Sequence, residues 1–166
     1  VNEEDIVPLA DYAVHHGAQL RFIEQMPLGP REQWRREDMV TAEDILTRLR
    51  THFSMAPARE PRGSAPAVLW EVSAPDGTRG TLGIIASVTH PFCGDCDRTR
   101  LTTDGAIRNC LFGNSETPLR DLLRSGASDE DIMEAWAGEM WTKKPGHGID
   151  DEGFLQPDRP MSAIGG

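Results

Sequence analysis

The three cysteines of this 166-residue chain all lie between positions 93 and 110. Cys93 and Cys96 form a C-x2-C pair, whose turn lets both sulfurs reach one metal centre. Cys110 follows an Asp-Gly pair, which is typical of a hairpin turn. An odd number of thiols cannot pair off completely as disulfides. The spacing therefore predicts three thiolates that converge on a metal site with one coordination position left open.

The spacing alone does not distinguish zinc from an iron–sulfur cluster. His90 stands three residues before Cys93 and would complete a tetrahedral Cys3His zinc site. Three cysteines can equally hold an iron–sulfur cluster. A disulfide with one free thiol would fit a secreted protein, of which the sequence gives no other sign. Both metals stay open at this point.

The hairpin also raises a question of register. A two-residue turn at 104–105 would set Cys110 opposite Thr99. Because side chains alternate between the two faces of a strand, that register places Cys110 on the opposite face from Arg98 and Arg100. A bulge or a longer turn would change the face. The sequence leaves the two arrangements open.

Composition and charge exclude several classes of protein. The content of 38% hydrophobic and 27% charged residues is that of a globular domain rather than a disordered chain. A formal net charge of −10 argues against a nucleic-acid or membrane-surface binder. No apolar run approaches the roughly 18 residues that cross a bilayer. We therefore expect a cytoplasmic protein, in which structural disulfides are rare.

The first elements along the chain alternate between helix and strand. Apolar residues at helical spacing predict a helix that ends at Gly17 and begins after its N-cap candidate Asn2 or bends at Pro8. The apolar run at 18–24 predicts a buried strand, and a capping-box pattern at 41–44 begins a second helix. Such alternation is typical of a parallel α/β sheet.

From residue 67 the hydrophobic pattern has a period of two, which predicts an antiparallel sheet. AVLWEVS and TLGIIASVT are strand-like and joined by a turn at 76–77, and RTRLTT and AIRNCLF form the second hairpin. Helices are predicted to begin at 117–118 and at 128. Residues 145–166 show no periodicity.

The segment HPFCGDCDRTRLTTDGAIRNCLFG resembles the C-terminal cluster-binding segment of the MoaA family, the radical S-adenosylmethionine GTP 3′,8-cyclases of molybdenum cofactor biosynthesis. The resemblance continues through VNEEDI, LRFIEQMPLG, PLRDLLRSGAS, KKPGHGI and RPMSAIGG, and so covers most of the chain. It implies an α/β fold in three parts. Residues 1–53 would be the last strand and helix units of an incomplete (β/α) barrel, 54–144 a cluster-binding domain with an antiparallel sheet and flanking helices, and 145–166 an extended tail ending in Gly-Gly.

The resemblance implies the C-terminal portion of an enzyme that converts GTP to 3′,8-cyclo-7,8-dihydro-GTP. Cys93, Cys96 and Cys110 match the ligands of a [4Fe–4S] cluster whose open iron accepts the guanine base of GTP. The chemistry also needs S-adenosylmethionine and another [4Fe–4S] cluster on a C-x3-C-x2-C motif, which this sequence lacks. We therefore expect no catalytic residue in this chain and no activity from the chain alone. The alternative is a non-catalytic, zinc-stabilised binding module.

The resemblance also implies contacts to GTP and to S-adenosylmethionine. Arg98, Thr99 and Arg100 match GTP contacts, and guanidinium groups suit the oxygens of a triphosphate. Arg21 matches a position near the nucleotide phosphates, and Met26 matches a contact to S-adenosylmethionine. Taken alone, the two arginines at 98 and 100 would be exposed strand cations and Met26 a core residue.

The C-terminal Gly-Gly and the predicted edge of the sheet could both contribute to function. Gly165 and Gly166 match a tail that reaches toward the active site in this family, although a terminal Gly-Gly by itself is more often a flexible end. An incomplete barrel exposes a sheet edge, through which a homodimer could form. The expected partners are GTP and S-adenosylmethionine, with no nucleic acid and no membrane.

Overall fold

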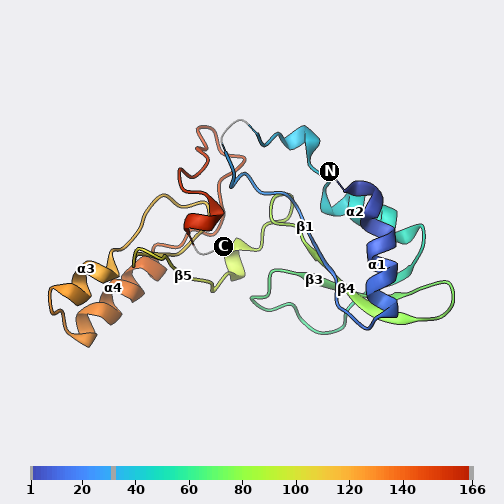
Figure 1. Cartoon of the computed structure of the whole chain (residues 1–166), viewed down its shortest axis with the longest axis horizontal. Coiled ribbons are helices and arrows are strands. Elements are labelled where there is room, and N and C mark those ends of the chain that lie inside the picture. The colour runs from blue at the N-terminus through green and yellow to red at the C-terminus, as the bar shows by residue number, and fades with distance from the viewer. Residues whose placement is uncertain (1, 31–32, 165–166) are drawn as a thin grey trace. The chain divides into compact units, whose positions relative to one another are not determined.

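The computed structural model describes residues 2–30 and 33–164 and forms two compact units (Figure 1). The sheet unit comprises Val1–Gln25 and Arg35–Phe92, and the cysteine unit comprises Met26–Trp34 and Cys93–Gly166. The expected mixture of α and β structure is confirmed. No helix in the described residues is long and apolar enough to cross a membrane. The barrel segment and the domain boundaries at 53/54 and 144/145 stay predictions.

The sheet unit consists of one mixed sheet with two helices. Its strand order is β1-β4-β3-β2, in which β1 runs parallel to β4 and the other neighbours are antiparallel. The elements are the short 3-10 helices η1 (Glu3–Asp5) and η2 (Arg36–Asp38), the helices α1 (Ile6–His15) and α2 (Ala42–Arg50), and the strands β1 (Arg21–Ile23), β2 (Ser54–Pro57), β3 (Val68–Ser73) and β4 (Arg79–Ile85).

The two helices and the sheet share one hydrophobic core. Pro8 is the third residue of α1, where its missing N–H would have no partner within the helix in any case. The later start that we predicted is therefore confirmed, but Asn2 makes no side-chain cap bond. Thr41 and Asp44 form the predicted capping box of α2. The core contains Ile6, Ala10, Val14, Ala42, Ile45, Leu49, Phe53, Val72, Ala74, Leu82 and Ile84.

The strand predicted at 18–24 is shorter and more exposed than we expected. In β1, Arg21 and Ile23 are exposed and only Phe22 is partly buried. The reason is its place at the edge of the sheet, where it has a neighbour on one side only among the described residues. The β3–β4 hairpin is as predicted, with its turn at 76–77 and Gly77 at φ +89°.

Glu24 follows β1 and is buried, with 1% of its surface exposed. Its carboxylate accepts hydrogen bonds from the backbone N–H of Ala42, at the start of α2, and from the N–H groups of Val88 and Thr89. The Thr89 hydroxyl donates to it as well, over 2.6 Å. One carboxylate therefore joins the end of β1, the start of α2 and the turn after β4. No pattern in the sequence marks Glu24 as a buried residue.

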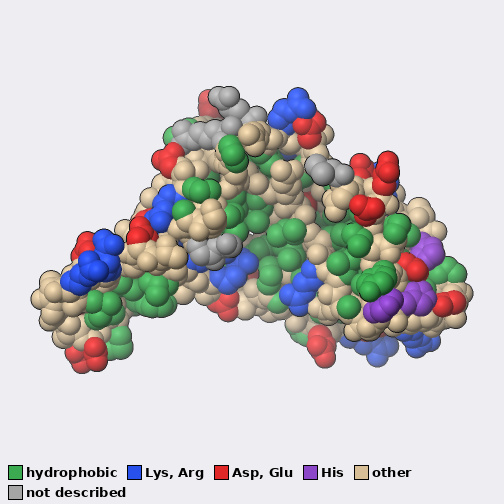
Figure 2. Space-filling model, viewed as in Figure 1, with side chains coloured by type: hydrophobic (Ala, Val, Ile, Leu, Met, Phe, Trp, Pro, Cys, Tyr) green, Lys and Arg blue, Asp and Glu red, His purple; other side chains and the backbone are tan. Residues whose placement is uncertain are grey.

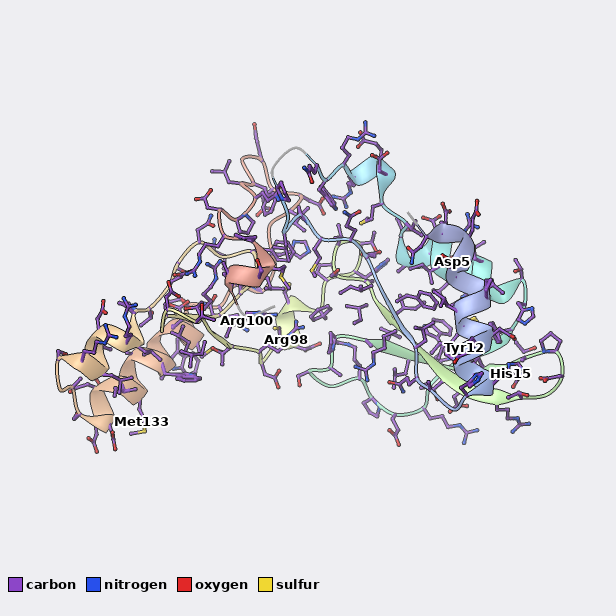
Figure 3. The ribbon with its side chains drawn as sticks, in the orientation of Figure 1. Asp5, Tyr12, His15, Arg98, Arg100 and Met133 are labelled. Carbon is purple, nitrogen blue, oxygen red and sulfur yellow. The ribbon has the colours of Figure 1, made fainter. Side chains whose placement is uncertain are left out.

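The cysteine unit contains a short hairpin and a pair of helices. The helices α3 and α4 lie side by side, and the predicted capping box of Ser128 and Asp131 begins α4 (Figure 1). Leu123, Met133 and Trp141 leave hydrophobic surface exposed on this pair (Figures 2 and 3). The elements are η3 (Cys93–Asp95), β5 (Arg100–Leu101), β6 (Ile107–Arg108), α3 (Leu119–Arg124), α4 (Asp129–Trp141) and η4 (Met161–Ala163).

Candidate metal centre

The turn between β5 and β6 contains three residues, which is one more than the two-residue turn at 104–105 considered above. Arg100 pairs with Arg108 and Leu101 with Ile107, and the N–H of residue 102 donates to the carbonyl of residue 106 over 2.8 Å. Gly105 takes φ +82°, which favours glycine. The two-residue register is therefore wrong and the longer turn is correct. Paired residues point to the same face of a hairpin, so Arg100 and Arg108 share a face, and this register, if continued beyond the strands, would set position 110 opposite position 98.

All three cysteines are free thiols and partly buried. The 3-10 helix η3 folds the C-x2-C segment, because the N–H of Cys96 donates to the carbonyl of Cys93 over 3.2 Å. Burial raises the pKa of the Cys93 thiol, and the nearby sulfurs of Cys110 and Cys96 raise it further. The sulfur of Cys93 thus lies within electrostatic reach of those of Cys96 and Cys110. That the three thiols converge on a metal stays a prediction.

Cys96 differs from Cys93 because cations surround its sulfur. Arg98 donates to it from Nε and from a terminal nitrogen over 3.4 and 3.3 Å, and Lys143 approaches it to 3.5 Å. Burial acts to raise the pKa of Cys96, but the hydrogen bonds and charge of Arg98, with the charge of Lys143, lower it overall. The site therefore favours a thiolate at this position.

Arg100, near Arg98 in Figure 3, is partly buried and lies within electrostatic reach of the sulfurs of Cys96 and Cys110. Burial lowers the pKa of its guanidinium, and the charge of Arg98 lowers it further, while Cys110 and Cys96 act in the opposite direction. Its Nε is buried and has no hydrogen-bond partner within the described part of the chain. A buried donor without a partner is costly, so this position favours an anionic group.

A pocket of about 430 Å³ opens beside Cys110 within the cysteine unit. Its lining combines an amide, a cation and two rings, from Asn109, Lys144, Phe112 and His147. The ring centroids of Phe112 and His147 are 5.2 Å apart. The cysteine site is therefore bordered by a hollow with polar groups on its wall.

The residues present fit an iron–sulfur cluster. Within residues 2–30 and 33–164, no group of three or more His, Cys, Asp or Glu side chains is arranged so that it could hold a metal ion. One zinc ion would sit about 2.3 Å from every sulfur. A cluster instead gives each thiolate its own iron and separates the sulfurs more widely. The three free thiols, bordered by arginine and lysine, supply the ligand type that such a cluster needs, and the cluster itself stays a prediction.

The other predicted site residues are placed as follows. The Thr99 hydroxyl donates to the carbonyl of Arg108 over 3.4 Å, and so lies within the hairpin. Arg21 is exposed on β1 and donates twice to Gln19, and Met26 is partly buried in the cysteine unit. The zinc alternative's fourth ligand, His90, belongs to the sheet unit, where Nδ1 lies 3.2 Å from the Thr89 hydroxyl. Gly165 and Gly166 lie outside the described residues.

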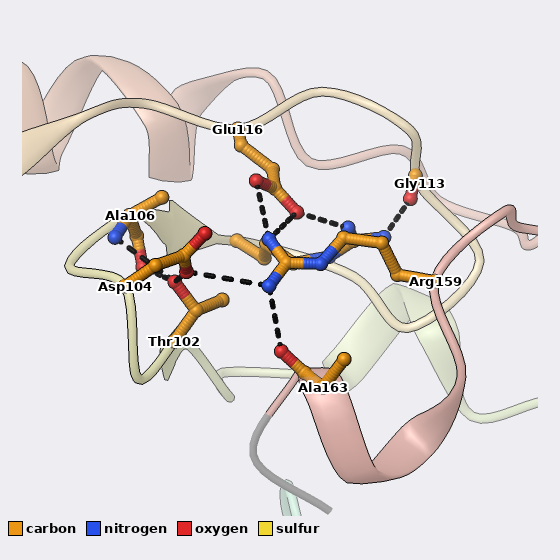
Figure 4. A network of polar contacts seen from close by, with 8 residues as sticks. Thr102, Asp104, Ala106, Gly113, Glu116, Arg159 and Ala163 are labelled. Carbon is orange, nitrogen blue, oxygen red and sulfur yellow. Dashed lines mark hydrogen bonds and ion pairs between the residues drawn. The ribbon is translucent and has the colours of Figure 1, made fainter.

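A second polar network, missed in the sequence, joins the hairpin to the C-terminal segment (Figure 4). Arg159 donates to both carboxylate oxygens of Glu116 over 2.9 and 2.8 Å, and to the carbonyl of Ala163 over 2.8 Å. It also pairs with Asp104, in the hairpin turn, over 3.3 Å. Arg108, which is 2% exposed, pairs with the same Glu116. No sequence pattern marks these charged residues as partners.

Comparison with known proteins identifies the family of the chain. The family described as Molybdenum Cofactor Synthesis C matches residues 18–149. Similar proteins include a GTP 3',8-cyclase of Corynebacterium glutamicum (strain ATCC 13032), which is 74% identical over 169 residues that cover 100% of this chain and 45% of that protein. Those of Mycobacterium sp. (strain KMS) and Mycolicibacterium smegmatis are 57% and 56% identical, each over 98% of this chain and 46% and 45% of the relative.

The chain thus spans a little under half the length of the curated relatives that it matches. The match covers both units, including the hairpin with the three cysteines. These findings confirm the resemblance to the C-terminal part of MoaA proteins that the sequence motifs indicated: the chain belongs to the Molybdenum Cofactor Synthesis C family.

Proposed function

We propose that this chain is part of a GTP 3′,8-cyclase and binds GTP at an iron–sulfur cluster held by Cys93, Cys96 and Cys110. The observation that supports the proposal most is the three-residue turn. It pairs Arg100 with Arg108, and the same register continued by two residues would bring Cys110 opposite Arg98. Thiolates for a cluster and guanidinium groups for phosphates would then occupy one surface, next to a pocket.

The cluster, when bound, supplies an iron without a protein ligand that accepts the guanine base of GTP. The chain's own residues bind and orient the rest of the nucleotide. Arg100 offers a buried Nε donor without a partner among the described residues, and a phosphate oxygen would satisfy it. Arg98 adds a second guanidinium fork, which suits phosphate geometry better than a lysine would. Thr99 between them contributes a hydroxyl.

The remaining parts of the proposal follow from the relatives' printed activity and from the family. Arg21 would contact the nucleotide phosphates and Met26 would contact S-adenosylmethionine. Gly165 and Gly166 would lie near the active site. The radical chemistry needs a further cluster on a C-x3-C-x2-C motif, and this sequence contains no cysteine besides the three in the hairpin. We therefore propose that the chain alone does not cleave S-adenosylmethionine.

Anaerobic reconstitution with iron and sulfide tests the cluster. We expect a brown protein with iron and sulfide in equal amounts, and a loss of both in the Cys110→Ser variant. A matched Ser115→Ala variant, changed nearby in the same unit, should retain the cluster. A colourless protein that takes up one equivalent of zinc and no iron would support the zinc-stabilised module instead. Reductive cleavage of S-adenosylmethionine by this chain would contradict the proposed inactivity.

Calorimetric titration of the reconstituted protein with GTP tests the nucleotide site. The Arg98→Ala, Arg100→Ala double variant should keep its iron but bind GTP at least tenfold more weakly, because each lost charge-assisted hydrogen bond contributes about 1.5–3 kcal/mol. Arg124→Ala removes one positive charge from an exposed position of α3 and should bind GTP like the parent. Equal GTP affinity in the double variant and the parent would refute the assignment of both arginines.

A further inference from the structure

The segment 142–147, which follows α4, reaches the surroundings of all three cysteines. It contains Lys143 and Lys144, the only lysines of the chain. Its contacts to the cysteine site are made by the Lys143 ammonium group and by the Thr142 hydroxyl, neither of which the proposed nucleotide contacts use. The segment therefore brings hydrogen-bond donors close to the sulfurs.

Lys143 is the strongest of these contacts. Its Nζ lies 3.5 Å from the sulfur of Cys96 and 2.5 Å from the carbonyl oxygen of Arg98. The carbonyl bond fixes the ammonium group in place beside the thiol, so the contact to sulfur does not depend on a freely moving side chain. Arg98 approaches the same sulfur, and Cys96 therefore receives donors from two elements.

The two ends of the segment are fixed near the other cysteines. On one side, the buried side chain of Asn109, next to Cys110, donates to the carbonyl of Glu139 and to the hydroxyl of Thr142, each over 2.8 Å. These bonds hold the C-terminal end of α4 against the hairpin. On the other side, the backbone of His147 lies close enough to Cys93 to lower the pKa of its thiol, against the larger effect of burial. The segment is thus tied to the neighbourhood of each thiol.

We propose that Lys143 is a positioning residue of the cysteine site, and that its ammonium group stabilises the Cys96 thiolate and raises the reduction potential of the cluster held there. The inference rests on the proposed function, because it assumes a cluster on the three cysteines. Hydrogen bonds to the sulfurs and nearby charge are among the features that set the potential of such clusters. A positive donor stabilises the reduced form, which carries one more negative charge than the oxidised form.

The test is a redox titration of the reconstituted chain, followed by electron paramagnetic resonance. Lys143→Met removes the charge and the donor while keeping most of the side-chain volume. We expect its potential to be lower than that of the parent by about 59 mV, which is a tenfold change in the ratio of reduced to oxidised cluster for one electron. Lys143→Arg keeps a positive donor and should restore most of the difference. Arg124→Met is the control for loss of one positive charge elsewhere in the same unit.

Each outcome decides between the explanations. A parent that takes up zinc and no iron contradicts the proposed function itself. A parent with a normal cluster, and a Lys143→Met variant with the same potential and iron content, overturns the role of Lys143 alone. An equal shift in Arg124→Met would also overturn it, because the effect would then be one of net charge. If Lys143→Met fails to retain iron, retention by Lys143→Arg supports the role, and failure of both variants with an intact circular dichroism spectrum refutes a role for the charge.

Discussion

Replacing Glu24 by glutamine tests how the sheet unit fixes the segments that leave β1 and β4. One carboxylate oxygen of Glu24 accepts from the N–H of Ala42 over 2.8 Å and from the hydroxyl of Thr89 over 2.6 Å. The other accepts from the N–H groups of Val88 and Thr89 over 2.8 and 2.9 Å. Glutamine has nearly the same shape but offers one acceptor oxygen and one donor nitrogen.

The structure gives the size of the effect. In its best orientation the new amide donates to the Thr89 hydroxyl, and its oxygen accepts from Val88 and Thr89. The N–H of Ala42 then faces a donor and stays buried without a partner, which costs about 1–3 kcal/mol. The surviving bonds lose the charge that makes them about twice as strong as neutral ones. We expect the free energy of unfolding of the sheet unit to fall by about 3 kcal/mol.

Hydrogen exchange measured by mass spectrometry on peptides from β1, β4 and α2 provides the assay. Glu71→Gln removes a carboxylate from an exposed position of β3 in the same unit and should change stability by less than about 0.5 kcal/mol. If Glu24→Gln and Glu71→Gln exchange at the same rates, the carboxylate does not hold these segments together and the reasoning is refuted.

The same carboxylate predicts a pH dependence. Burial acts to raise the pKa of Glu24, but hydrogen bonds from Thr89, Ala42 and Val88 lower it below its ordinary value of 4.5. Because the pKa is lower in the folded state, the stabilisation is fully present above about pH 4.5 and is lost as the pH falls through the lowered pKa. The difference in stability between parent and Glu24→Gln should therefore shrink in acid, which the same exchange experiment measures.

Three further changes have expected outcomes. Gly105→Ala should destabilise the cysteine unit by about 1–3 kcal/mol in a thermal melt, since Gly105 has φ +82° and an added Cβ would lie 2.6 Å from Cβ of Arg120. Arg159→Met should speed hydrogen exchange in the C-terminal segment. The reason is that Arg159 binds this segment to Glu116 and Asp104, and also donates to the carbonyl of Ala163 within the segment. Hydrogen bonds to the Asp76 carboxylate and to the backbone carbonyl of Asp11 raise the pKa of His15. The stabilisation that protonated His15 gives to the fold is therefore present below about pH 6.5 and is lost as the pH rises through the raised pKa. An NMR titration of His15 measures this pKa.

Each of these predictions has a control within the chain. Gly126 also has a positive φ, of +79°, but a Cβ added there would meet no atom within 4 Å. If Gly126→Ala lost as much stability as Gly105→Ala, the clash with Arg120 would not be the cause. Arg124→Met should leave exchange of the C-terminal segment unchanged, and equal effects of the two arginine variants would contradict the anchoring. Asp76→Asn should return the pKa of His15 toward 6.5, and no change would rule out the ion pair.

The local structure of this chain could be read from the sequence where short-range chemistry decides it. The capping boxes at 41–44 and 128–131 and the turn at 76–77 each depend on residues a few positions apart. The spacing of the three cysteines also predicts that they converge on a metal, and this stays a prediction. The exposure of β1 could not be predicted, because an apolar run does not show whether a strand has one neighbour or two.

The polar networks could not be predicted because their partners are far apart in the sequence. Glu24 meets Val88 and Thr89 more than sixty positions away, and Arg159 meets Glu116 across 43 positions. Neither carboxylate differs in type from the many exposed acids of an acidic chain. Burial alone distinguishes them, and burial is set by the packing of whole elements rather than by neighbouring residues.

The number of residues in the turn between β5 and β6 determines which face of the hairpin the side chains after the turn occupy. Removing one residue from this turn would shift the register by one and turn the side chains of β6 to the other face of the hairpin, just before the segment that leads to Cys110. Removing or inserting two residues would leave the side chains after the turn on the same face of the hairpin and would change only the length of the turn. The cysteine site can therefore tolerate changes in the length of this loop in steps of two, but not in steps of one.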